Sequence, residues 1–446
     1  MTATASYWTT NGGAGTPPDH PVESADGRRL ETPTRLWMLL VTAVTAVLTV
    51  SLVTAFSLAG RESTATSTAQ STEALYVDAQ DLAYNLADAN ATATTSLLVG
   101  RHAPGQFNER YDADLTEAED LLASTSQHVA GDAYALGQLK LVGEQIPVYT
   151  GLIGQALADD RLGAAGASAA DSSLDQASAL LTGSLLFETN NVILEEQAAT
   201  VQGTASADTF PWWVLLFGLL GFVAVRIAGR RVARISNRRL NPGLLGATIV
   251  VLGLIAWSLF AWGGAGIETN SSNYDFTGVS ETQSQLSQLS ATETYMALQL
   301  IDHGSDKGAD EKGAKAALAG ADPDLSEVTS SSATAVADAQ GAFSTYSDCV
   351  LTAVNLAAGG QYQQATTTAV GSGANGGESG CEAEAETVRG DVAGIFDQSQ
   401  AHFTADMSSL AGQYAGSGAL PVPIALGVLG AAAAAYGVNR RLAEYR

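Results

Sequence analysis

The stretch Leu36–Ala59, LWMLLVTAVTAVLTVSLVTAFSLA, decides the fold of this chain. It holds no charged residue, and an α-helix needs about 20 apolar residues to cross the hydrocarbon core of a bilayer. Three more apolar stretches of similar length follow it. We therefore predict four membrane-spanning helices, at Leu36–Ala59, Phe210–Ala228, Leu244–Ile267 and Leu420–Val438.

The four spans divide the chain into two halves with the same order of parts: a span, a long acidic region and a second span. The chain has 46 acidic and 21 basic residues and a net charge of −25. Such a surface excludes nucleic acid as a partner, because binding to phosphates depends on Lys and Arg. The predicted parts besides the spans are a disordered tail over 1–35, outer regions over 60–209 and 268–419, a basic link over 229–243 and a short tail over 439–446.

The arginines predict the orientation of the spans. They gather in three clusters beside span ends, and the positive-inside rule places such clusters on the cytosolic side. Both termini and the basic link are then cytosolic, and both outer regions face away from the cytosol across the plasma membrane. The clustered residues are Arg28, Arg29, Arg35, Arg226, Arg230, Arg231, Arg234, Arg238, Arg239, Arg440, Arg441 and Arg446.

The first span has an alternative interpretation as a cleaved signal peptide, since Ser57-Leu58-Ala59 resembles a cleavage site. The apolar core of a signal peptide has roughly 7–15 residues, and this stretch is longer. We therefore expect it to remain as a membrane anchor.

Both outer regions show apolar residues at spacings of three, four and seven, the pattern of helices packed along their length. Each region leaves the membrane and returns to it, so an even number of helices is required. Segments rich in Gly, Pro and Asp separate the apolar runs and favour four helices per region. We predict an all-α membrane protein with four transmembrane helices and two extracytoplasmic up-down four-helix bundles made by internal duplication. Representative rows are Leu75/Leu82/Ala89, Leu139/Ile146/Ile153, Leu180/Phe187/Leu194/Val201 and Val336/Phe343/Val350, and Tyr149 and Tyr346 hold the same place in their rows.

The connections at the membrane-distal tips are the predicted partner or ligand sites. Arginine suits the planar recognition of a carboxylate on a partner or an amino acid. The alternative is that these arginines simply pair with nearby Asp112, Asp159 and Asp160. The candidate residues at the tips are Arg101, His102, Arg110, Asp159, Asp160, Arg161, Asp306, Lys307 and Asn355.

The two cysteines, Cys349 and Cys381, both lie in the second outer region. An even number of cysteines in an oxidising compartment favours one structural disulfide. A metal pair or a reactive thiol is the alternative, although no third or fourth ligand stands near. We expect the bond to brace the second distal tip.

Motifs for chemistry are missing from the sequence. The five histidines show no metal-ligand spacing on a helix face, and there is no phosphate-binding glycine loop and no nucleophile elbow. No span has an ionisable residue at mid-membrane depth, which argues against an ion pathway. We therefore predict no enzyme activity, no metal and no cofactor, and we expect a sensor or signal transducer.

Two local patterns support a resemblance to a known family. One is the run Ala79–Ala89, AQDLAYNLADA. The other is the segment from Tyr149 to Asp160-Arg161-Leu162-Gly163, which is echoed in the second half from Tyr346 to Asn355 and Gly359. With the doubled layout, the chain resembles the GlnX-like four-span membrane sensors of actinobacteria, whose outer bundles are similar to chemoreceptor sensor domains. The resemblance implies an input from GlnH, an extracytoplasmic amino-acid-binding lipoprotein, and an output to a cytosolic Ser/Thr kinase of the PknG type. The resemblance is also compatible with a homodimer of this chain.

The basic link offers the largest candidate docking surface on the cytosolic side. Juxtamembrane arginines mostly fix topology and contact anionic lipid headgroups. Docking of a kinase or adaptor is the second interpretation, and it concerns Arg230, Arg231, Arg234, Arg238 and Arg239. For the whole chain, the alternatives to a sensor are a structural cell-envelope protein and an accessory subunit of a transport complex.

Overall fold

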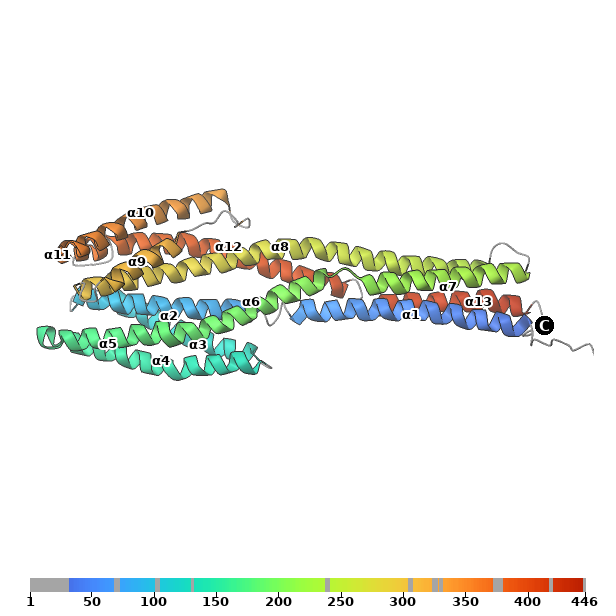
Figure 1. Cartoon of the computed structure of the whole chain (residues 1–446), viewed down its shortest axis with the longest axis horizontal. Helices are drawn as coiled ribbons and strands as arrows, with labels where there is room; N and C mark the ends of the chain where they lie inside the picture. Colours follow the sequence, from blue (N-terminus) through green and yellow to red (C-terminus); the bar gives the residue numbers. More distant parts are fainter. Residues whose placement is uncertain are drawn as a thin grey trace, which may run out of the picture.

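The described part of the chain is helical throughout and contains no strand. The structure is a computed structural model. It shows a long molecule with a narrow bundle at one end and two packed helical lobes at the other (Figure 1). The described residues are 32–67, 73–100, 105–129, 132–236, 241–303, 308–322, 328, 332–371, 380–416 and 420–443.

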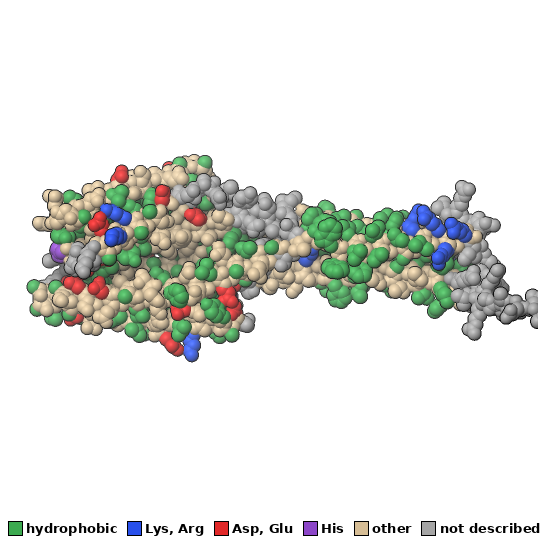
Figure 2. All heavy atoms as spheres, in the orientation of Figure 1, with side chains coloured by type: hydrophobic (Ala, Val, Ile, Leu, Met, Phe, Trp, Pro, Cys, Tyr) green, Lys and Arg blue, Asp and Glu red, His purple; other side chains and the backbone are tan. Residues whose placement is uncertain are grey.

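The narrow end is made of the four membrane helices. They are α1 (Thr32–Ser67), α7 (Trp212–Ser236), the first part of α8 (Pro242–Ile301) and α13 (Pro421–Ala443). Their apolar spans cover Leu36–Thr64, Trp212–Arg234, Pro242–Gly263 and Pro421–Arg440. Apolar side chains cover the outside of this end (Figure 2), as a surface against lipid requires. The predicted all-α membrane fold with four spans is confirmed.

Small residues let the membrane helices approach closely. A Cβ atom built on Gly243 of α8 would lie 2.3 Å from the carbonyl oxygen of Ala433 on α13, so only glycine fits there. The Asn241 side chain caps α8 by accepting from the Gly243 backbone N–H and donates to the carbonyl of Gly437. Close backbone contacts of this kind hold helices together in lipid, where burial of apolar surface cannot.

The first lobe contains four helical rods. These are α2 (Glu73–Val99), α3 (Gly105–His128), α4 (Ala133–Asp160) and a last rod formed by α5 (Ala167–Leu180), the π-helical turn η4 (Leu181–Leu185) and α6 (Leu186–Asp208); the short 3-10 turn η3 (Gly163–Ala165) lies between α4 and α5. Their buried faces form one apolar core that includes Leu82, Leu139, Tyr149 and Leu174. Tyr149 is fully buried, as its place in the heptad row predicts.

The second lobe repeats this plan with longer connections between its helices. It contains the outer part of α8, α9 (Ala309–Gly320), α10 (Ala333–Ala358), α11 (Tyr362–Val370) and α12 (Cys381–Gly416). Tyr346 is fully buried in its core. Cys349 on α10 and Cys381 at the start of α12 form a disulfide with a Cα–Cα distance of 5.4 Å, so the predicted bond is confirmed.

One apolar row was predicted on the wrong face of its helix. Phe187, Leu194 and Val201 of α6 are 57%, 54% and 50% exposed, while Thr189 and Val192 are buried. Two causes explain the difference. The core face of α6 carries threonines and Glu196, so its hydrophobicity is low, and the π-turn η4 adds a residue to the rod and shifts the register of the buried face.

The lobes connect to the membrane helices in different ways. α8 is one uninterrupted helix from Pro242 to Ile301, so it continues from its span into the second lobe. By contrast, α6 ends at Asp208 and α7 begins at Trp212, on either side of Pro211. Proline lacks the N–H that would continue the helix, which explains the break.

Candidate functional site

The centre of the wide end is a contact between the two halves of the chain, where α2 and α8 lie side by side. The Gln283 side chain donates to Asp81 and the Ser290 hydroxyl donates to Asp88, and both pairs are 202 residues apart. A constant separation means that the two helices run parallel and in register. The duplicated units therefore face each other through equivalent helices.

A cluster of charged side chains, most of them buried or half-buried and one of them, Glu386, exposed, joins the halves along this contact. It draws on α2 and α3 from the first half and on α8 and α12 from the second. We call it the inter-half charge cluster, made of Asp88, Arg110, Glu293, Glu382, Glu386 and Arg389.

Arg389 of α12 is the centre of the cluster. Its Nη2 atom lies 2.9 Å from Glu293 Oε2 on α8 and 3.3 Å from Asp88 Oδ1 on α2, and its Nη1 atom lies 2.7 Å from Glu386 Oε2. The Arg389 side chain is buried. One guanidinium thus bridges carboxylates from both halves by charge-assisted hydrogen bonds and ion pairs.

Arg110 of α3 makes the reciprocal bridge. Its Nη2 atom lies 2.8 Å from Asp88 Oδ1 in the same half. Its Nη1 atom lies 3.2 Å from Glu382 Oε1 and 3.4 Å from Glu386 Oε2 on α12 of the other half. The two arginines therefore share Asp88 and Glu386, and neither half supplies all the partners of its own arginine.

Burial and charge set the pKa values in the cluster. Burial tends to raise the pKa of Asp88, but Arg389 and Arg110 outweigh it and hold that pKa below its usual value. Burial raises the pKa of Glu293 to about 8, against the opposing effect of Arg389. Beside the cluster, burial and then the Asp88 charge raise the pKa of Asp114 to about 7. The carboxyl groups outnumber the arginines here, so near neutral pH some of them keep a proton.

The inter-half charge cluster is sensitive to the loss of any one of its charged groups. A buried ion network stabilises only while every partner is present, and removing one partner leaves an uncompensated charge that costs about 3–5 kcal/mol. A protonation change or a shift of α12 against α2 therefore changes the contact between the halves as a whole. The cluster is therefore the joint between the two halves.

Only one of the predicted tip residues belongs to this cluster. Arg110 was expected at the first tip, with Asp112 among its alternative partners, and it pairs instead with Asp88, Glu382 and Glu386. Asp159, Asp160 and Arg161 lie at the turn between α4 and α5, at the end of the molecule farthest from the membrane helices (Figure 1).

The other tip residues are not brought together. Arg161 is exposed, and among the described residues the structure records no ion pair for it. Asn355 is exposed in the last turn of α10. Arg101, His102, Asp306 and Lys307 lie outside the described residues.

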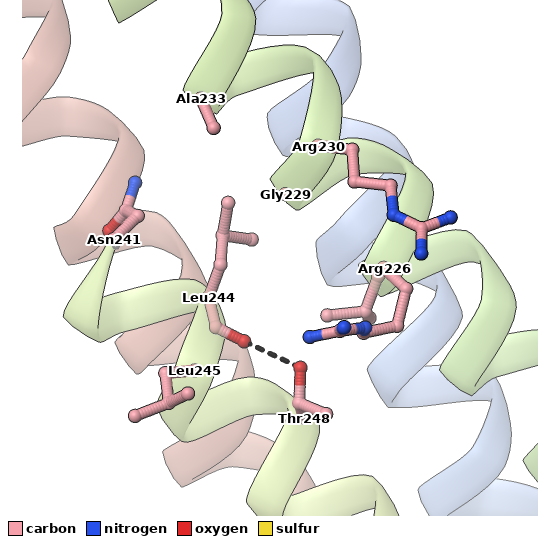
Figure 3. Close-up of a pocket in the computed structure, with 9 residues that line it drawn as sticks. Arg226, Gly229, Arg230, Ala233, Asn241, Leu244, Leu245 and Thr248 are labelled. Carbon is pink, nitrogen blue, oxygen red and sulfur yellow. Dashed lines mark hydrogen bonds between the residues drawn. The ribbon is translucent and has the colours of Figure 1, made fainter. Parts of the chain in front are cut away.

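The arginines of the basic link lie at the opposite end of the molecule. Arg226 and Arg230 of α7 line a pocket of about 170 Å³ with Thr248 of α8 and the residue that caps α8, Asn241. The Arg226 guanidinium points toward Thr248, and that of Arg230 points away from it (Figure 3). Arg231 and Arg234 are exposed on α7. Arg238 and Arg239 lie outside the described residues. The exposed guanidinium groups suit phosphate or carboxylate groups.

Five residues of the cluster were missed in the sequence: Asp88, Glu293, Glu382, Glu386 and Arg389. Arg389 carried a signal, since it is a single basic residue in a helix that begins with several glutamates. The pairing across a separation of 202 residues gave no local signal. Among the described residues, no group of His, Cys, Asp and Glu could hold a metal ion.

Comparison with known proteins gives one match. Residues 64–205 match the model of the actinobacterial sensor domain, and this segment holds α2 to α6. No curated protein and no solved structure matches the chain. The matched segment lies between two of the four membrane helices and supplies half of the inter-half contact. The first outer region is thus similar to an actinobacterial sensor domain, and together with the four membrane helices this match fits an actinobacterial membrane sensor.

Proposed function

We propose that this chain is a non-enzymatic transmembrane signal transducer whose two outer lobes change their contact in response to an extracytoplasmic signal. The observation that carries the proposal is α8. This single helix of 60 residues begins beside the basic link, crosses the membrane region and supplies Glu293 to the inter-half charge cluster. A displacement at the cluster is therefore transmitted along one rigid rod to the other side of the membrane.

The signal that fits the family resemblance is an amino acid delivered by a binding lipoprotein of the GlnH kind. Such a protein would approach the chain from the distal end, where Asp159, Asp160 and the exposed Arg161 lie. In this arrangement both lobes lie outside the cytosol, and both termini and the basic link lie inside it. The supporting observation is the concentration of arginine at the narrow end of the molecule (Figure 2).

The receiver that fits is a cytosolic Ser/Thr kinase of the PknG type, or an adaptor for it. Arg226, Arg230, Arg231 and Arg234 form an exposed basic surface at the cytosolic end of α7. An acidic or phosphorylated face of a kinase complements this surface, and anionic headgroups share it.

The experiment follows the signal in cells that carry the chain as their single copy. Arg389→Met breaks the inter-half cluster, and Lys140→Met removes an exposed Lys of the first lobe that pairs with Glu144 at 3.7 Å. External glutamine and glutamate are added, and phosphorylation by the cytosolic kinase is measured. We expect Arg389→Met to abolish the response and Lys140→Met to leave it intact. A normal response in cells that lack the chain would refute the proposal.

A further inference from the structure

A groove of about 450 Å³ lies between the two halves, on the membrane side of the charge cluster. Its walls come from α2 and α6 of the first half and from α8 of the second. Tyr76 and Gln80 of α2 and Gln283 and Ser287 of α8 are among the residues that line it, and Phe187 of α6 stands at one side. The volume is within the range of about 300–1,000 Å³ typical of small-molecule sites.

Two buried glutamines line this groove with incomplete hydrogen bonding. Gln80 and Gln283 are 5% and 3% exposed. The Nε2 group of Gln80 donates to the Tyr76 hydroxyl at 2.8 Å, and that of Gln283 donates to Asp81 Oδ1 at 3.0 Å. The amide oxygen of each side chain has no hydrogen-bond partner among the described residues. Both oxygens are covered from solvent in this structure. An unpaired buried acceptor costs about 1–3 kcal/mol, so both oxygens favour a ligand whose donors displace the atoms that cover them.

The amide orientation at Gln283 is fixed by its neighbour. A carboxylate accepts hydrogen bonds, so Asp81 selects the Nε2 side of the amide and leaves Oε1 as the free acceptor. At Gln80 the Nε2 group donates to the Tyr76 hydroxyl, which can both donate and accept, so this contact does not fix the amide in the same way. The acceptor at Gln283 is therefore the one that its neighbour sets.

The lining of the groove disfavours a charged ligand, and an anion above all. None of the described side chains that line it is Asp, Glu, Lys, Arg or His, and its polar groups are amides and hydroxyls. A carboxylate buried there would have no counter-charge, which is strongly unfavourable, and an ammonium group would meet no acidic side chain in the lining itself. Phe187 and Leu194 add exposed apolar surface beside these polar groups.

We propose that this groove binds an uncharged polyhydroxylated molecule of mono- or disaccharide size. Its hydroxyl groups donate to the amide oxygens of Gln80 and Gln283, and its apolar ring face packs on Phe187. This site is separate from the distal tips and from any input delivered by a binding protein. Because the groove joins α6 to α8, its ligand bridges the halves and changes how they contact each other.

The π-helical turn η4 gives this site a second distinctive feature. It immediately precedes α6, and Thr182 within it lines the groove. π-turns occur frequently at functional sites, because the extra residue re-aims the side chains of the following helix. Here the shifted register leaves Phe187 facing the groove side and away from the core of the first lobe.

The test is direct binding to the full chain in lipid nanodiscs, prepared without sugar-based detergents because these would compete. Maltose and trehalose are the neutral probes, and glutamate and glucuronate are the charged ones. Binding is followed by saturation-transfer NMR and by thermal unfolding. We expect a neutral sugar to bind and to raise the unfolding temperature, and both charged probes to fail.

Variants locate the site. Gln283→Met removes the free acceptor, and we expect it to weaken sugar binding tenfold or more, where each tenfold corresponds to ~1.4 kcal/mol. Phe187→Ala removes the apolar face without touching the core, and we expect it to weaken binding about threefold. Gln176→Met and Leu136→Ala, exposed on α5 and α4, are the matched controls and should bind like the unmodified chain. The proposal is overturned if no neutral sugar binds the folded chain, if glutamate binds equally well, or if Phe187→Ala and Gln283→Met bind normally. None of these readouts depends on the kinase, so they stand apart from the test of signalling.

Discussion

The two halves of this chain share one plan and differ in how firmly each is held. In the second half, α8 runs unbroken from the membrane into the lobe, and a disulfide ties α10 to α12. In the first half, the rod that returns to the membrane contains a π-turn and stops at Pro211. From this comparison we predict that the second half is the more rigid of the two and the first half the more adaptable. The inter-half charge cluster is the joint between them.

The largest expected effect comes from breaking that joint. Arg389→Met leaves Glu293 and Asp88 without their shared partner, and we expect a loss of about 3–5 kcal/mol in the free energy of unfolding. Chemical denaturation of the purified chain in nanodiscs measures it. Lys140→Met, at an exposed ion pair, should change stability by less than about 1 kcal/mol. Equal stability of the two variants would mean that the cluster does not hold the halves together.

The disulfide should give the next largest effect. Replacing Cys349 and Cys381 by Ser opens a loop with a sequence separation of 32, and the loop-entropy relation gives a loss of roughly 3–4 kcal/mol. We expect the loss in the second lobe first, seen as faster amide hydrogen exchange in α10 and α12. Exchange in α4 and α5 serves as the internal control. A uniform change in both lobes would contradict the assignment of rigidity to the second half.

The sequence predicted the helices and the disulfide of the two halves better than the charge cluster that joins them. Four apolar stretches and the heptad rows were sufficient for the spans and for the buried Tyr149 and Tyr346, because burial repeats locally along a helix. The disulfide followed from the presence of two cysteines alone. The pairing of Asp88 with Arg389 joins residues from different halves, and no local pattern encodes which acid meets which arginine.

The face of α6 was mispredicted for a different reason. Its buried positions include Thr189, Glu196 and Thr200, while apolar Phe187 and Leu194 are exposed. Hydrophobicity alone therefore selected the wrong row. The π-turn, which shifts the register, has no distinctive sequence signature here beyond Gly183.

Proton binding at the joint gives the third prediction. The folded pKa of Glu293, about 8, is above its ordinary value because burial of the side chain, together with the charges of Glu382 and Asp88, outweighs the opposing effect of the two arginines. The protonated form of Glu293 stabilises the folded chain. This stabilisation is fully present below the ordinary pKa of a glutamate, and it is lost as the pH rises through about 8. Asp114, with a pKa raised to about 7, acts in the same direction. Asp88 has a lowered pKa, so its contribution is lost only under strongly acidic conditions.

We therefore expect the unfolding temperature to fall from pH 5 to pH 8, with a loss of at least the ~1.4 kcal/mol that one unit of pKa shift represents. Differential scanning calorimetry of the nanodisc sample at several pH values measures the change. Glu293→Gln keeps the shape and cannot ionise, so it should flatten the profile. A profile that is equally steep in Glu293→Gln would assign the pH dependence to other groups.

The smallest expected effect tests the corrected face of α6, and with it the adaptable character of the first half. Val192 is fully buried in the first core, so Val192→Ala should lower stability by roughly 1 kcal/mol, the typical size for a small core truncation. Phe187→Ala removes a larger side chain that is more than half exposed, and it should stay within about 0.5 kcal/mol. Thermal unfolding of the two variants side by side makes the comparison. A larger loss of stability for Phe187→Ala than for Val192→Ala would mean that the Phe187 row faces the core and that η4 causes no shift of register. The first half would then be packed as regularly as the second.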